Sequence, residues 1–371
     1  MRDYQASVEK ISAVVYRFFD RTFTRFCIEG PRIDLPALRG ARVMVPATHR
    51  SQADYFIVGR MLHGMGIQNM RFAAGDNLTG LPVIGRIYRA LGAFTVKRHN
   101  TRRPSYVRDL CEQVAGMLVD GDTIVVFPEG GRSYEGGMME MKSGIIGSAI
   151  LAQAREPSAG VYYFPAAVSY ECLPELVYFG MLRKGKQMRN PSHGLLRRLI
   201  GSVLYFGADL IAYARFLTAH RFGRNYGAVY VDYGEPVRVS SFIEKDEIDG
   251  GRPGRDEFFR FRGSMQAAAL ALYDRFLSLY RILPAHIVSS VLINTAARTP
   301  GELAPLCAEV AGMLRAKGRN MKTADAFAGV DLVCEGVRQL GLVKAARMRG
   351  GRIDMQKPWI VRYYAATVDG E

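Results

Sequence analysis

Short apolar runs alternate with amphipathic stretches along the first two thirds of the chain. The apolar runs predict strands at 42–47, 70–74, 92–96, 123–127, 161–169 and 227–233. Apolar residues at helical spacing between them predict helices near 52–64, 82–90, 105–119 and 144–155. This alternation indicates an α/β, layered domain with a central mixed sheet flanked by helices, which we assign to residues 40–245.

The pattern differs at both ends of this domain. Residues 8–26 combine apolar positions at helical spacing with a basic side, so we predict an N-terminal amphipathic helical region over residues 1–39. It either lies at a membrane interface or packs on the main domain. A polar, Gly/Pro-bearing joint at 246–254 leads to helical patterns at 257–280 and 285–297. Thr299-x-x-Glu302 with Pro300 is a capping box opening a further helix, and we predict a small all-α C-terminal module over 255–371.

Composition and charge narrow the class of protein. The chain has 371 residues, of which 49% are hydrophobic, and its 50 Lys and Arg against 35 Asp and Glu give a formal charge of +15. This charge favours an anionic partner, and the chain has no recognisable nucleic-acid module, so we expect no nucleic-acid partner. Five scattered cysteines and a start without a secretory h-region predict reduced thiols in the cytoplasm.

One long apolar stretch runs from Leu199 to Leu217. It contains Asp209 and Arg215, which makes a spanning helix doubtful. We predict that it dips into a membrane interface, and the alternative is a helix buried against the main domain.

The segment behind the first apolar run carries the strongest candidate chemistry. His49 follows the run 43–47, and Asp54 stands five positions on, a layout that can hold a general base and its orienting carboxylate over one pocket. Ser51-x-x-Asp54 also fits a capping box that opens a helix over 54–63, which is the structural alternative.

Other predicted strands end in polar groups that suit an anionic ligand. Lys97 and Arg98 follow one strand, and Glu129, Gly130, Gly131, Arg132 and Ser133 follow another. Guanidinium groups grip phosphate, and paired glycines let backbone N–H groups approach an anion. Because ligands of α/β sheets bind outside the carboxyl ends of the strands, we expect these groups to converge with His49. Taken singly, each is an ordinary basic pair or Gly-rich turn.

In order and spacing these segments resemble the glycerol-3-phosphate and dihydroxyacetone-phosphate acyltransferase branch of the glycerolipid acyltransferases. An H-x4-D block matches His49 and Asp54, and a G-x-x-F-x-x-R block matches Gly92, Phe94 and Arg98. An F-x-E-G-x-R-S block matches 127–133, and a proline-containing block matches 165–170. The segment A-A-G-D-N-L at 73–78 is similar to this branch rather than to lysophosphatidate acyltransferases. Tyr134 departs from the branch, which usually has a basic residue there, and 194–222 is an extra apolar segment.

The resemblance implies an O-acyltransferase whose catalytic domain spans 40–245. It implies that His49 is the general base and that Asp54 orients it. It further implies that Arg98 and Arg132, helped by Lys97, bind the acceptor phosphate, and that Glu129 contacts the glycerol or fixes Arg132. Gly130 and Gly131 are candidate oxyanion donors, Ser133 belongs to the substrate site, and we expect neither a metal nor a cofactor.

We therefore predict transfer of a fatty acyl group from acyl-CoA or acyl-carrier protein to the sn-1 hydroxyl of glycerol 3-phosphate in phospholipid biosynthesis. Dihydroxyacetone phosphate and 1-acylglycerol 3-phosphate are alternative acceptors, and a non-catalytic lipid-binding relative is a further alternative. The charge suits an anionic membrane surface, so we expect a peripheral or monotopic protein on the cytoplasmic face of the membrane.

Overall fold

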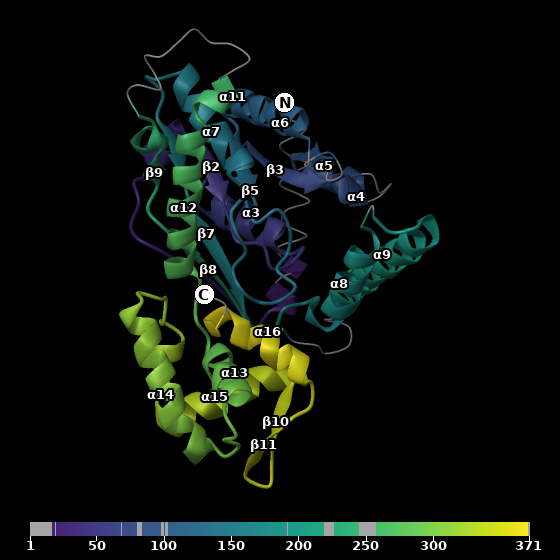
Figure 1. Cartoon of the computed structure of the whole chain (residues 1–371). Helices are drawn as coiled ribbons and strands as arrows, with labels where there is room; N and C mark the ends of the chain where they lie inside the picture. Colours follow the sequence, from purple (N-terminus) through teal and green to yellow (C-terminus); the bar gives the residue numbers. More distant parts are fainter. Residues whose placement is uncertain are drawn as a thin grey trace.

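The computed structural model describes residues 17–18, 20–67, 69–79, 84–97, 100, 103–190, 192–218, 226–244 and 257–369. It has α/β layers followed by a mainly helical C-terminal part (Figure 1). The strands are β1 (Arg25–Glu29), β2 (Arg42–Pro46), β3 (Met70–Gly75), β4 (Ala93–Val96), β5 (Thr123–Val126), β6 (Val161–Tyr163), β7 (Ala166–Tyr170), β8 (Ala228–Tyr233), β9 (Val237–Arg238), β10 (Ala346–Arg349) and β11 (Arg352–Met355). The α-helices are α2 (Leu35–Gly40), α3 (Asp54–Gly64), α4 (Asp76–Thr79), α5 (Ile84–Ala90), α6 (Pro104–Val119), α7 (Ser143–Arg155), α8 (Phe179–Met188), α9 (Leu195–Leu217), α11 (Glu257–Arg260), α12 (Arg262–Leu279), α13 (Pro284–Asn294), α14 (Pro300–Ala316), α15 (Gly329–Leu342) and α16 (Pro358–Asp369).

A six-stranded sheet in the order β4-β3-β5-β2-β6-β9 forms the centre of the domain. Its strands are parallel except for β9, which pairs antiparallel with β6 at one edge. β2 is apolar after Arg42, as expected for a strand with both faces covered. Val43 and Val45 pack into one core with α3, whereas Met44 packs into a second core with α6, α7 and α12. The predicted mixed sheet between helical layers is thereby confirmed.

The predicted strand at 161–169 is divided in two. Pro165 has no N–H to donate to a neighbouring strand, and it separates β6 from β7. β6 stays in the central sheet, while β7 joins a three-stranded sheet in the order β1-β8-β7. A parallel bridge between Ala47 and Ala166 keeps the start of β7 beside the end of β2. Residues from the fourth motif block therefore reach the tip of the strand that carries His49.

The N-terminal part contains a strand where the sequence pattern indicated helix. β1 covers residues 25–29 and pairs in parallel with β8 along its whole length, with Arg25 opposite Ala228. Residues 1–16 and 19, which carry most of the predicted amphipathic helix, lie outside the described residues. The prediction was wrong at 25–29 because β-pairing with a strand 200 residues away leaves no local periodic signal.

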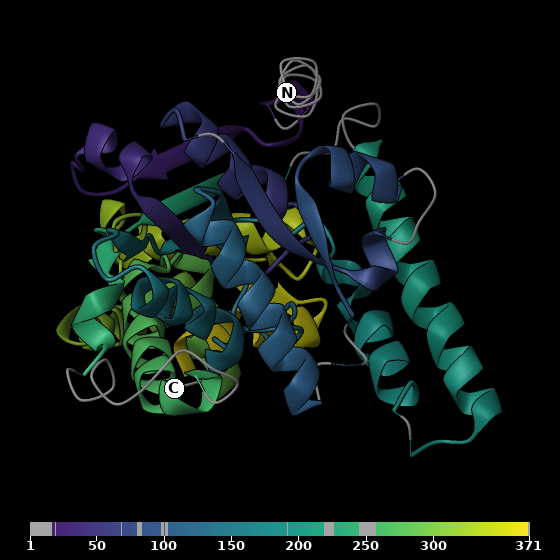
Figure 2. The ribbon, with the colours of Figure 1, turned by 90° about the horizontal axis from the view of Figure 1, so that it is seen from above.

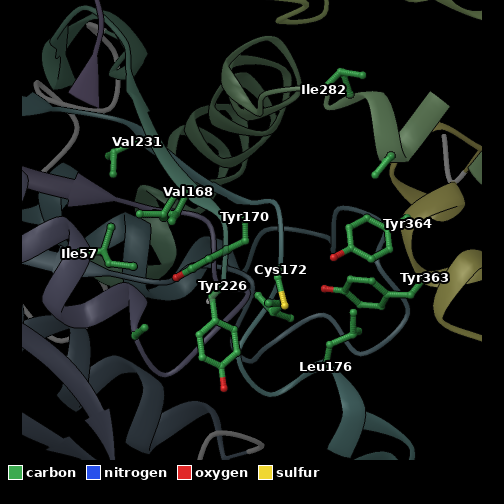
Figure 3. Packing of buried hydrophobic residues seen from close by; sticks show 14 of the residues in the cluster. Ile57, Val168, Tyr170, Cys172, Leu176, Tyr226, Val231, Ile282, Tyr363 and Tyr364 are labelled. Carbon is green, nitrogen blue, oxygen red and sulfur yellow. The ribbon is translucent and has the colours of Figure 1, made fainter. Parts of the chain in front are cut away.

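The C-terminal part is mainly helical and contains the predicted helices, but it is not all-α, because residues 346–355 form the antiparallel hairpin β10–β11. Thr299 Oγ1 accepts the N–H of Glu302, and the Glu302 carboxylate accepts the N–H of Thr299, so the predicted capping box is confirmed. Tyr364 of α16 packs in the same core as Val168 and Tyr170, and its hydroxyl donates to the carbonyl of Glu171 (2.7 Å) (Figure 3). The C-terminal helices thus help to fix the end of β7.

His286, buried in α13, gives the fold a predicted dependence on pH. Its Nδ1 accepts the N–H of Leu283 (3.1 Å), and burial, with the nearby cations Arg50 and Arg319, lowers its pKa to about 3. As the pH falls below about 6.5, the unfolded chain takes up a proton here and the folded chain does not, so stability is lost towards pH 3. We expect wild type to lose about 2 kcal/mol more than His286→Asn between pH 7 and pH 5 in urea unfolding. Equal losses in both proteins would contradict this role.

Candidate active site

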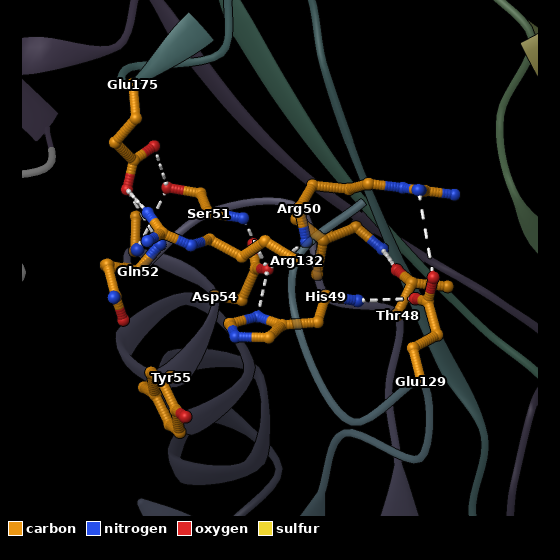
Figure 4. Close-up of polar contacts among 12 residues, drawn as sticks. Thr48, His49, Arg50, Ser51, Gln52, Asp54, Tyr55, Glu129, Arg132 and Glu175 are labelled. Atoms are coloured by element: carbon orange, nitrogen blue, oxygen red, sulfur yellow. Dashed lines mark hydrogen bonds and ion pairs between the residues drawn. The ribbon is translucent and has the colours of Figure 1, made fainter. Parts of the chain in front are cut away.

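The turn between β2 and α3 brings His49 and Asp54 together, as the spacing predicted (Figure 4). The His49 Nδ1 lies 3.0 Å from Asp54 Oδ2. The imidazole stacks on Phe127 from the end of β5, with ring centroids 4.4 Å apart, and its edge meets Tyr55 of α3. Both side chains of the pair are buried. A buried carboxylate on Nδ1 fixes the tautomer in which Nε2 is the basic nitrogen.

Asp54 accepts hydrogen bonds from several directions. Oδ2 accepts the backbone N–H groups of Arg50 (2.6 Å) and Ser51 (2.8 Å), in addition to its contact with the His49 imidazole. Oδ1 accepts a hydrogen bond from the hydroxyl of Tyr170. Burial and the nearby Asp54 carboxylate hold the pKa of Tyr170 well above its ordinary value, which keeps it a neutral donor. The Asp54 carboxylate therefore closes the turn and contacts the imidazole at once. Its bond from the Ser51 N–H is one of the two bonds of a capping box, but the predicted box is incomplete, because α3 has Ala53 at its N-cap without a side-chain hydrogen bond.

Glu129 lies on the other side of His49 and is buried. Its Oε1 accepts the backbone N–H of His49 (2.8 Å), its Oε2 accepts that of Met139 (3.2 Å), and the Arg50 guanidinium lies 3.8 Å away. Burial raises the pKa of Glu129. Glu129 thus anchors the backbone that carries His49. One of its two expected roles was to fix Arg132, and its hydrogen bonds go instead to the backbone of His49 and Met139.

Arg132 is also buried, and carboxylates already surround it. Its Nη2 donates to Asp209 of α9 (2.8 Å), and its Nη1 lies 3.6 Å from Glu175. Glu175 in turn accepts the Ser51 hydroxyl (2.7 Å) and the backbone N–H of Gln52 (2.8 Å). The two carboxylates balance the positive charge of this guanidinium, so it is not available to a phosphate unless Asp209 moves.

The glycine turn after β5 is shaped for a close backbone approach. Gly130 has φ of +71°, a conformation that favours glycine, and its N–H donates to the carbonyl of Phe127 (3.0 Å). That bond leaves Gly131 as the better candidate for an oxyanion donor. Ser133 is buried, and its hydroxyl donates to Gly137 (2.8 Å) and accepts the N–H of Gly136 (3.1 Å), so it closes the loop.

Lys97, the described member of the predicted basic pair, lies at the edge of the sheet. β4 is three strand spacings from β2, about 14 Å, and its carboxyl end is on the same side. Lys97 is exposed there, and its backbone N–H donates to the Tyr106 hydroxyl (2.8 Å). Arg98 lies outside the described residues.

Residues 32–169, which contain the whole His49–Asp54 turn and the glycine turn, match the family model described as Acyltransferase. This part of the chain therefore matches the acyltransferase family. A glycerol-3-phosphate acyltransferase of Xanthomonas axonopodis pv. citri is 32% identical over 219 residues, which is 58% of this chain and 22% of that protein. One of Actinobacillus succinogenes is 27% identical over 226 residues, 61% of this chain and 25% of that protein. These matches confirm the resemblance inferred from the motifs.

The chain spans a quarter or less of the length of those two relatives. Among solved structures, the 1-acyl-sn-glycerophosphate acyltransferase PlsC from Thermotoga maritima is 18% identical. The superposition covers 74% of this chain and 83% of the PlsC chain. Its TM-score is 0.36, which is too low to inform the fold or the substrate.

The sequence patterns assigned no role to several residues of the candidate site. Tyr170 lies in the matched block 165–170, whereas Glu175 and Asp209 contact the site from 124 and 77 positions away along the chain, and no local motif indicates their contacts. Lys186 of α8 was also missed. Its Nζ lies 3.9 Å from where a Cβ on Gly131 would stand, so it adds a cation over the glycine turn.

Removing Arg132 is expected to destabilise the fold. Arg132→Ala leaves Asp209 and Glu175 buried without their cation, which costs about 3–5 kcal/mol. Asp209→Asn in the same background should recover part of that loss, since it removes one of the stranded charges. Urea unfolding of the two single variants and the double variant measures the coupling. Losses that simply add within about 0.5 kcal/mol would contradict the pair.

Proposed function

We propose that this chain transfers a fatty acyl group from acyl-CoA or acyl-carrier protein to the sn-1 hydroxyl of glycerol 3-phosphate, in phospholipid biosynthesis. The observation that carries the proposal is the His49 imidazole held by Asp54 at the tip of β2. The names of the curated relatives support glycerol 3-phosphate as the acceptor.

His49 acts as general base in this proposal. Nε2 takes the proton of the acceptor hydroxyl while the oxygen attacks the thioester carbonyl carbon. The tetrahedral intermediate then collapses, the C–S bond breaks, and the imidazolium returns the proton to the leaving thiolate. Asp54 stabilises the transient imidazolium, as the carboxylate of a catalytic triad does. No acyl-enzyme forms.

The oxyanion of the tetrahedral intermediate and the phosphate of the acceptor are separate negative charges, and each needs its own hydrogen-bond donor or cation. The Gly131 N–H is our candidate donor to the oxyanion. Lys97 and Arg98 at the end of β4, together with Lys186, are cations for the acceptor phosphate, while Arg132 joins them only if it releases Asp209. Glu129 and Ser133 have an indirect role in this proposal. Glu129 holds the backbone of His49, and Ser133 holds the loop that follows the glycine turn.

We place the protein on the cytoplasmic face of a membrane, as a peripheral or monotopic enzyme. One described helix, Leu195–Phe216, is long and apolar enough to cross a bilayer by length and composition. Its Asp209 pairs with Arg132, which favours an interfacial position over a spanning one.

The phosphate role of Arg98 predicts a selective effect on the acceptor. Arg98→Ala is expected to raise the KM for glycerol 3-phosphate about 10–100-fold through a lost charge-assisted contact of about 1.5–3 kcal/mol. The KM for the acyl donor should change far less. Arg108→Ala on α6, a half-buried arginine whose guanidinium pairs with Asp109, is the control. An unchanged acceptor KM would remove Arg98 from the site.

An acceptor panel tests the proposed function itself. Purified protein is given acyl-CoA or acyl-carrier protein with glycerol 3-phosphate, dihydroxyacetone phosphate or 1-acylglycerol 3-phosphate, and thiol release is followed. We expect the largest kcat/KM with glycerol 3-phosphate. A larger value with either other acceptor would overturn the proposed substrate, and no acceptor-dependent release would overturn the activity.

A further inference from the structure

A row of exposed apolar side chains runs along one side of α9. Val203 is 74% exposed and Leu210 is 62% exposed, whereas large apolar side chains elsewhere are mostly buried. The row is made of Leu195, Leu196, Leu199, Ile200, Val203, Phe206, Leu210 and Ile211. Since each helical residue turns by about 100°, all of these lie within about 80° of the direction of Val203. We call this row the outer face of α9.

The opposite side of α9 is fixed to the protein. Tyr205, Ala208, Ala212 and Phe216 are buried there, and Asp209 reaches Arg132 in the candidate active site. These contacts fix the orientation of α9, so the outer face remains exposed. Figures 1 and 2 both show α9 and its neighbour α8 projecting together at one side of the molecule.

Two glycines let α8 and α9 pack closely as a hairpin. A Cβ on Gly185 would come within 2.8 Å of the carbonyl oxygen of Gly201, and one on Gly201 would come within 2.9 Å of the carbonyl oxygen of Gly185. The hairpin is thus a defined, closely packed unit.

Exposed cations lie on the same hairpin as the outer face. Residues 179–217 carry seven Lys and Arg but one acidic residue, Asp209, which is buried and paired. The exposed cations include Lys184 on α8, Arg189 directly after α8, and Arg197 and Arg198 in the first turn of α9, about 120° and 140° around the helix from Val203. The Arg189 guanidinium lies 4.9 Å from the ring centroid of Phe206, so charge and apolar surface adjoin.

We propose that the outer face of α9 and these cations form one docking surface for an anionic phospholipid bilayer. Apolar side chains enter the acyl boundary while the cations meet lipid phosphates, which is how interfacial helices bind. A second copy of the chain fits poorly, because two such hairpins would bring cations of the same sign together.

The surface deepens the proposed function, on which its biological meaning rests. Asp209 and the outer face are on opposite sides of the same helix, so Arg132, the residue of the candidate active site that Asp209 contacts, lies about one helix diameter, about 10 Å, from the bilayer. An acylated product then has a short path into the lipid phase.

Vesicle flotation of the full chain tests the apolar part. The variant Leu199→Ser/Val203→Ser/Leu210→Ser removes exposed side chains only, and Leu270→Ser/Met313→Ser/Val330→Ser is the matched control on exposed sites elsewhere. On vesicles of phosphatidylcholine with phosphatidylglycerol we expect the α9 variant to bind at least about tenfold more weakly than wild type. The control should bind like wild type.

The charged part has its own variant. Lys184→Gln/Arg197→Gln/Arg198→Gln is expected to weaken binding to the anionic vesicles by about fivefold per cation. It should leave the weak binding to pure phosphatidylcholine unchanged. Arg349→Gln/Arg352→Gln/Arg362→Gln changes three exposed cations of the C-terminal part and is the control.

Flotation does not depend on turnover, so failure of the proposed reaction and failure of this surface are distinguishable. Wild-type binding by the folded α9 variant, or equal loss in its control, would overturn the proposal. A dimer in vesicle-free buffer that the α9 variant abolishes would assign the face to a second copy and would also overturn it.

Discussion

His49→Ala is expected to lower kcat by about 10²–10⁴-fold or more while leaving the fold intact. Alanine removes the nitrogen that takes the hydroxyl proton, and nothing else in the described turn offers a base to that position. The backbone N–H of residue 49 still reaches Glu129, and Asp54 keeps the Tyr170 hydroxyl and the N–H groups of Arg50 and Ser51. The measurement is steady-state thiol release at saturating donor and acceptor.

The control for His49 is His63→Ala, an exposed histidine at the end of α3. It should keep wild-type turnover. Thermal unfolding of both variants separates a chemical loss from an unfolded protein. Wild-type kcat in folded His49→Ala would eliminate the imidazole as the base.

Asp54→Asn is expected to lower kcat by a similar factor, about 10²–10⁴-fold. The amide oxygen can take the place of Oδ2 and still accept His49 Nδ1 and the two backbone N–H groups. The Tyr170 hydroxyl can rotate to accept from the amide nitrogen. The fold therefore survives, but a neutral amide does not stabilise the imidazolium that forms when the base is protonated.

Tyr170→Phe provides a graded comparison for Asp54→Asn. It keeps the carboxylate charge and removes one of its donors, so we expect a smaller loss of kcat than with Asp54→Asn. Exposed Asp109→Asn on α6 is the matched substitution without an expected effect. A larger loss in Tyr170→Phe than in Asp54→Asn would mean that Tyr170, rather than Asp54, holds the imidazole.

Much of the α/β domain was predictable because its signals are local. The apolar run 42–47 is a strand buried on both faces, and α6 begins and ends within a residue of its prediction. The His49–Asp54 contact spans five residues, so spacing alone was enough to place it. The capping box at Thr299 was equally readable.

The contacts that were not predictable join distant parts of the chain. From the sequence, Asp209 was a charged residue inside an apolar stretch, which made a membrane-spanning helix doubtful. Its partner Arg132, 77 residues away, explains its position there. The same holds for the second sheet, where β1 pairs with β8. The apolar stretch 199–217 fitted two expectations, a segment that dips into a membrane interface and a helix buried against the main domain. The sequence could not separate them, because one side of the helix is buried against the domain and the other is exposed.

The most direct test of the central claim is to identify the product made from acyl-CoA and glycerol 3-phosphate by wild type and by His49→Ala. Mass spectrometry of the extracted lipid, with the two proteins purified from a host lacking its own acyltransferase of this kind, gives both identity and position. We predict that wild type accumulates 1-acylglycerol 3-phosphate in step with released thiol and that His49→Ala forms it only at background rate. Thiol release by wild type without this product, or equal product from His49→Ala, would contradict the account.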